Sequence, residues 1–161
     1  MRLHDVVIDE GDAERIDWVL SSFLGESGAA EVLLIDRSGQ LLAKGGLSGS
    51  LDTVSISALA AGAFASTGAM AGLLGEPEFT VLFHQGVKES LHVSTVDDHT
   101  IFMAIFDEGT TVGMVRLFAR EAGRLIAEIL DETRRRPERT RHSIDPLTAD
   151  EAIPAFMEQP T

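Results

Sequence analysis

The sequence holds few side chains whose types and spacing suit catalysis or metal binding. Three of its five His stand in or beside strand-like runs, at His84, His92 and His99. None has a Glu/His pair near it at metal-ligand spacing, so we expect no metal site. The run Asp97-Asp98-His99 could bind a cation, but a polar hairpin turn explains it better.

Motifs for nucleotide binding and nucleophilic catalysis are missing as well. The chain has no Walker A motif, dinucleotide glycine fingerprint, nucleophile elbow or His-Glu-x-x-His. Gly45-Gly46 with Ser48 and Ser50 precedes a predicted helix and could hold an anion, but no Lys follows in that helix. The absence of Cys excludes disulfides, thiolate metal sites and Cys nucleophiles. We therefore expect no catalytic residues and no cofactor.

Charge and length narrow the class of protein further. The 161 residues include 26 acidic and 13 basic side chains, which give a net charge of −13. From Arg134 onward five Arg balance five acids, so the whole excess of acid belongs to residues 1–133. Such a balance argues against nucleic-acid binding, which needs clustered cations. The acidic N-terminus has no signal-peptide pattern, which predicts a cytoplasmic protein.

Hydrophobic periodicity predicts one domain over residues 1–136 and a flexible tail over 137–161. Apolar residues at helical spacing predict helices over 11–25, 53–75 and 110–136. Short apolar or alternating runs predict strands over 31–35, 40–44, 79–84, 88–96 and 100–106. Gly39 is expected to supply a positive φ in the first hairpin turn. The resulting fold class is α/β, of the α+β type.

The second predicted helix is unusual because residues 53–75 contain no charged side chain. Its length would span a bilayer, but small residues dominate and no basic flank follows, so we do not expect a membrane span. Small residues on one face would let another backbone come close. They are Ala58, Ala61, Ala65, Gly68, Ala69 and Gly72. Plain burial beneath a sheet is the alternative, although a helix without a charged side is expected to have both faces covered or to await a partner.

An ordered set of short motifs runs through residues 5–135. They are Leu34–Leu41, Asp52-Thr53, Leu59–Gly62, Leu73–Glu76 with Phe79, Phe83–Gly86 with Lys88, Ser90-Leu91, Ile105–Asp107 and Gly113 with Val115, Arg116 and Leu117. The set resembles the roadblock/dynein light chain family, and within it the bacterial gliding-motility regulators. This resemblance implies a single five-stranded, mainly antiparallel sheet flanked by three helices, which is the roadblock (profilin-like) architecture.

The resemblance also implies a function that needs no active site in the chain itself. It implies a homodimer that pairs sheet edges and second helices, and a GTPase-activating role toward a small Ras-like GTPase of the MglA type in cell polarity or motility. Two chains would bind one GTPase and remodel its switch loops without an arginine finger. The first alternative is a dimeric scaffold that binds a GTPase or motor complex without activating it. A small-ligand sensor or enzyme is the second.

The predicted partner-binding residues lie mainly on the small-residue face of the second helix. Arg116 and Lys88 are additional candidates as surface cations, and the bulky Phe64 is expected to narrow the docking surface. In the tail, the capping box 148–151 precedes an apolar group that is expected to contact a partner, with a disordered end as the alternative. That group is Ile153, Phe156 and Met157.

Overall fold

The computed structural model of the protein describes residues 2–3, 6–46 and 49–137. Its helices are α1 (Glu10–Ser27), α2 (Thr53–Leu73) and α3 (Val112–Arg135). Its strands are β1 (Arg2–Leu3), β2 (Val6–Val7), β3 (Glu31–Asp36), β4 (Leu41–Gly46), β5 (Val81–Gln85), β6 (Ser90–Asp97) and β7 (Thr100–Phe106). The predicted tail contacts Ile153, Phe156 and Met157 lie outside the described residues, so the division into domain and tail stays a prediction.

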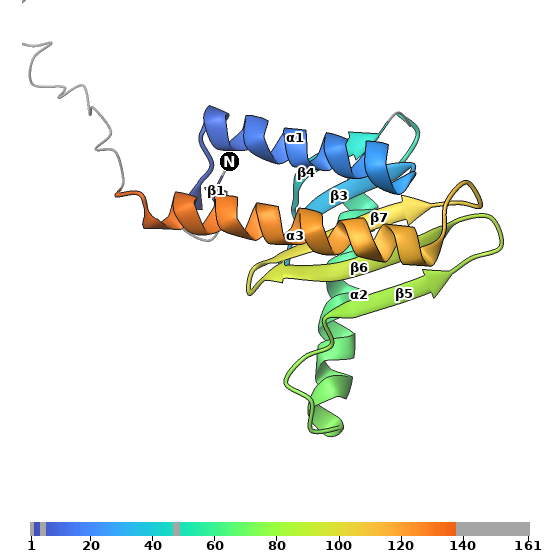
Figure 1. Ribbon diagram of the computed structural model, residues 1–161. Helices are drawn as coiled ribbons and strands as arrows, with labels where there is room; N and C mark the ends of the chain where they lie inside the picture. Colours follow the sequence, from blue (N-terminus) through green and yellow to red (C-terminus); the bar gives the residue numbers. More distant parts are fainter. Residues whose placement is uncertain (1, 4–5, 47–48, 138–161) are drawn as a thin grey trace, which may run out of the picture.

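Five strands form one antiparallel sheet in the order β4-β3-β7-β6-β5. Helices α1 and α3 cover one face of this sheet and α2 lies on the other (Figure 1). The predicted fold class is therefore confirmed, and so is the order of the three predicted helices and five predicted strands. The two free edges of the sheet are β4 and β5.

Alternation along the central strands explains how two helix layers share one sheet. In β3, Val32 and Leu34 belong to the core under α1 and α3, whereas Leu33 and Ile35 belong to the core on the α2 side. Every residue of β7 is buried, as expected for a central strand with both faces covered. The edge strand β5 is mostly exposed.

Each helix begins at a side chain that caps its first turn. Asp9 accepts a hydrogen bond from the Asp12 amide at 2.8 Å, Asp52 accepts one from the Ser55 amide at 3.0 Å, and Thr111 accepts one from the Met114 amide at 3.2 Å. Two of these caps precede long apolar stripes, and the third precedes the uncharged helix α2.

The structure differs from the sequence-based boundaries in a few places. The short β1–β2 pairing was not predicted, because two-residue strands have no readable period. Helix α2 ends at Leu73, two residues before the predicted limit, and Gly75 turns the chain with a φ of +78°. Strand β6 starts at Ser90, because Lys88 lies in the β5–β6 turn.

Candidate protein-interaction surface

Helix α2 contacts the sheet through only a few side chains. Its fully buried residues are Ser57, Ala61, Phe64 and Ala71. Phe64 packs into the core on this side of the sheet with Leu33 and Val93 among its partners in the cluster, and only 4% of it is exposed. The expectation that Phe64 narrows a docking surface is therefore wrong, because its ring points into the sheet.

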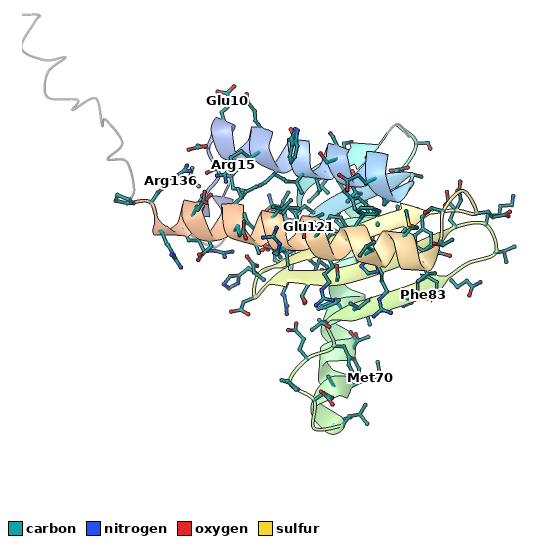
Figure 2. The ribbon with its side chains drawn as sticks, viewed as in Figure 1. Glu10, Arg15, Met70, Phe83, Glu121 and Arg136 are labelled. Atoms are coloured by element: carbon teal, nitrogen blue, oxygen red, sulfur yellow. The ribbon has the colours of Figure 1, made fainter. Side chains whose placement is uncertain are left out.

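Ile56 and Ala60 also pack partly against this core, and most of the remaining residues of α2 are exposed in the described chain. Its C-terminal half extends past the sheet, and Met70 lies on this projecting part (Figures 1 and 2). Leu73 is 89% exposed, an unusual position for a large apolar side chain. The exposed large apolar residues of α2 and its C-cap are Val54, Leu59, Met70, Leu73 and Leu74. A contiguous uncharged surface of this kind is typical of a protein–protein contact.

The predicted small-residue face divides between the sheet and the solvent. Ala58, Ala65, Ala69 and Gly72 are exposed and Gly68 is half-buried. Ala61 instead faces the sheet side and is 7% exposed, next to the β3–β4 turn that contains Gly39. We define the α2 surface as the exposed large apolar residues of α2 and its C-cap together with the exposed residues of the small-residue face. It consists of Val54, Ala58, Leu59, Ala65, Ala69, Met70, Gly72, Leu73 and Leu74, with Gly68 at its margin.

The glycines of α2 have no packing role within the described chain. A Cβ added at Gly62, Gly68 or Gly72 would meet no heavy atom within 4 Å. Glycine in a helix interior costs roughly 0.5–1 kcal/mol relative to Ala, so three of them in one helix are unfavourable for the isolated fold. Close approach of another backbone would account for them.

The position of α2 is set by the β3–β4 turn. The Arg37 guanidinium lies over the Phe64 ring, 5.4 Å from its centroid, and pairs with Glu78 in the segment that follows α2. Arg37 also donates to the backbone oxygen of Asp97 at 3.3 Å. A Cβ at Gly39, whose φ is +99°, would stand 3.2 Å from the Cα of Ala58. This turn therefore holds the sheet-bound half of α2 and leaves the other half free.

The two cationic candidates do not lie with the α2 surface. Arg116 is an exposed residue of α3, on the opposite face of the sheet, and Lys88 lies in the β5–β6 turn. Arg116 is close enough to His92 to act on it electrostatically. His92 is 3% exposed, and burial, followed by the charge of Arg116, lowers its pKa from 6.5 to about 4. This His is a neutral core residue.

Strand β5 offers a second uncovered feature that the sequence did not single out. It is an edge strand, and its apolar residues Val81 and Phe83 are 37% and 40% exposed. The Phe83 ring stacks on Phe106 with centroids 6.1 Å apart, so Phe83 (labelled in Figure 2) is held at the edge. An exposed edge with apolar side chains is a template for pairing with another strand.

Within the described ranges, no group of three or more His, Asp or Glu side chains is arranged to hold a metal ion. Among the helices that the structure describes, α2 alone is long and apolar enough to cross a membrane, and 22% of its apolar window is buried inside the protein. Phe64 and Ala61, near the middle of this helix, are both buried in the protein.

Comparison with known proteins agrees with this architecture. The Roadblock/LC7 domain matches residues 15–106. Among solved structures, a protein described as MglB with tetrameric arrangement shares 34% identity, with 80% of this chain and 96% of that chain covered and a TM-score of 0.76. Among curated proteins, none matches the chain.

Two further solved structures have similar sequence identities and TM-scores. The gliding protein MglB from Thermus thermophilus shares 35% identity at a TM-score of 0.75, with 79% of this chain and 96% of that chain covered. Myxococcus xanthus MglB shares 35% identity at a TM-score of 0.70, with 73% and 95% covered. On the domain match and these neighbours, the chain belongs to the Roadblock/LC7 family.

Proposed function

We propose that the chain is a regulator of a small Ras-like GTPase of the MglA type, acting as a homodimer that accelerates GTP hydrolysis in cell polarity or motility. The observation that carries this proposal is the uncharged, uncovered α2 surface on a fold that resembles MglB. A protein of this kind works by contact and has no active site of its own. The proposed location is the cytoplasm.

The geometry supports a homodimer built from β5 and the neighbouring part of α2. Two copies related by a twofold axis could pair their β5 edges and extend the sheet across both chains. The same axis would bring the two projecting α2 ends together, which would cover Leu73 and Met70. The small residues Gly68 and Gly72 would then permit close packing of helix backbones.

The remaining exposed part of the α2 surface is the proposed seat of the GTPase. Its residues Ala58, Ala65 and Ala69 have short side chains, so the switch loops of a GTPase could approach the helix backbone closely. An arginine finger supplies several powers of ten in hydrolysis rate in other GTPase activators. The proposed mechanism replaces that effect by holding the switch loops so that the GTPase's own residues act on the attacking water. If one GTPase docks across the dimer, the complex contains two chains of this protein for each GTPase.

The decisive experiment measures GTP hydrolysis by the Ras-like GTPase of the same organism with and without the full-length protein. Acceleration at substoichiometric amounts of the protein supports the proposal. Binding without acceleration identifies the dimeric scaffold, the alternative function. Neither binding nor acceleration would overturn both, and a ligand-binding role would then have to be tested.

A further inference from the structure

The face of the molecule opposite α2 carries an open groove between α1 and α3 of about 360 Å³. Its apolar lining is formed by Val19, Leu125 and Ile129, and Glu14 contributes to its rim. Val19 and Ile129 are each 4% exposed and belong to the core beneath, so the apolar lining is continuous with the packed interior. This groove lies on the other side of the sheet from the proposed GTPase seat.

The groove also contains the chain's single tryptophan. Trp18 is 67% exposed, although the core next to it is already filled by its helix neighbours Ile16 and Val19. A large aromatic side chain beside an apolar hollow supplies contact area to a bound segment at low conformational cost. Trp18 and Leu125 together therefore favour an apolar occupant.

The chain itself provides that occupant near the groove. Arg136, directly after α3, bonds to Asp9 at 2.8 Å and to the buried Asp12 at 2.9 Å. These contacts fix the end of α3 beside the start of α1, at the end of the helix pair where Arg15 and Arg136 are labelled in Figure 2. The sequence then continues from this point with residues 138–161.

The lengths of the linker and of the path match. Leu125 precedes Pro137 by 12 residues along the chain, which corresponds to roughly 18 Å of helix. A random-coil chain with the length of residues 138–152 has a root-mean-square span of about 20 Å. The effective concentration of a tethered segment is highest when its linker span equals the distance to its site. The apolar group that begins at Ile153 is therefore well placed for this groove.

The composition of the segment agrees with the same occupant. Ile153, Phe156 and Met157 follow the spacing i, i+3, i+4, which suits insertion of apolar side chains into a helix–helix groove.

We propose that the apolar segment 153–157 binds in the α1–α3 groove of its own chain and packs against Trp18. Binding of the segment in this groove does not depend on the proposed GTPase. If the same segment also contacts that GTPase, the two sites compete for it, and the bound fraction in the groove lowers the apparent affinity of the tail for the GTPase.

Trp18 is itself the reporter for the test, because its emission is the only tryptophan emission of the chain. We expect the double variant Phe156→Ser/Met157→Ser of the full-length protein to shift Trp18 emission to the red and to raise acrylamide quenching severalfold. The matched control Ile144→Ser removes an apolar tail side chain outside the segment and should leave both signals unchanged. A synthetic peptide of residues 146–161, added to the double variant, should restore the blue emission.

Two results would overturn the proposal. Identical emission and quenching for the wild type and the double variant would show that the segment does not reach Trp18. A blue emission of the wild type that disappears on dilution would assign the occupant to the tail of a second copy. Since no GTPase is present in these measurements, their failure is independent of the hydrolysis experiment.

Discussion

The guanidinium of Arg37 lies 5.4 Å from the centre of the Phe64 ring, which connects the β3–β4 turn to the buried side of α2. The same guanidinium pairs with Glu78, just before β5. One side chain therefore fixes both the sheet-bound half of α2 and the segment that leads out of it. The free half of α2 begins beyond this attachment.

Replacement of this side chain should loosen α2. We expect Arg37→Ala to lower the free energy of unfolding by about 1–2 kcal/mol, because a half-buried ion pair and a cation–π contact are lost together. Arg124→Ala removes an exposed Arg that pairs with Glu121 and Glu128, and it should lower the free energy of unfolding less than Arg37→Ala does. Denaturant midpoints of the two variants check this order. Equal midpoints would contradict it.

Replacement of the α2 glycines by Ala should stabilise the fold of the single chain and weaken its self-association. Gly68→Ala and Gly72→Ala should each stabilise the isolated chain by about 0.5–1 kcal/mol, because open space surrounds both positions. Both variants should weaken self-association in sedimentation measurements, because a partner backbone is kept away. Gly25→Ala in α1 has equally open surroundings and should stabilise the chain without changing association. Unchanged association in the α2 variants would mean that no backbone approaches there.

A charged side chain on the small-residue face should abolish GTPase binding. Ala65→Arg and Ala69→Arg each add a long cation at an exposed position, so the fold should persist while the close contact is blocked. Circular dichroism should be unchanged, and binding measured by calorimetry should disappear. The control Ser21→Arg places the same side chain on an exposed position of α1. Normal binding of either α2 variant would remove this face from the proposed interface.

The buried His92 should make the fold sensitive to acid. Its pKa is lowered to about 4 in the folded protein from 6.5, so the unfolded chain binds the proton more tightly. The stability that depends on neutral His92 is present above pH 6.5 and is lost as the pH falls toward 4, by at most about 3 kcal/mol. His92→Gln should flatten this part of the stability–pH curve. The exposed His84→Gln serves as control and should leave the slope as in the wild type.

The buried carboxylate of Asp12, in the first turn of α1, should contribute to the stability of the fold. Asp12 is 1% exposed and accepts hydrogen bonds from Thr133 at 2.8 Å and from Arg136. Asp12→Ala should lower the free energy of unfolding by about 1–2 kcal/mol, because the buried contacts to Asp12 are lost while Arg136 keeps Asp9 and the Thr133 hydroxyl keeps the Ile129 carbonyl as acceptors. Asp131→Ala, which removes an exposed partner of Arg135, should cost about 0.5 kcal/mol or less. Thermal unfolding compares the two.

Strong periodicity made the large elements predictable from sequence. Strand β7 is apolar at nearly every position and was expected to be central, and the stripe of α3 indicated a helix with one buried side. The missed pairing of Arg2–Leu3 with Val6–Val7 has two residues in each strand, too few to show alternation. The elements that were predicted well are those in which local pattern and burial agree.

The sequence did not predict which members of the small-residue face are exposed, because a helical wheel shows which residues share a side but not which side meets the sheet. In α2 the side that meets the sheet is the one that carries Phe64 and Ser57. Ala61 is therefore buried, whereas Ala65 and Ala69 are exposed. For Arg116 the sequence contains no information on which face of the sheet α3 covers. The exposure of Trp18 had one signal in the sequence, a lone tryptophan next to Asp17 on an acidic helix.

The projecting half of α2 should affect how quickly the protein is degraded in a cell. A newly made copy without a partner carries Met70, Leu73 and Leu74 into an environment of chaperones and proteases that recognise exposed apolar segments. Binding of a partner removes that signal by covering it. The abundance of the protein should therefore follow the abundance of what it binds, and surplus copies should be short-lived.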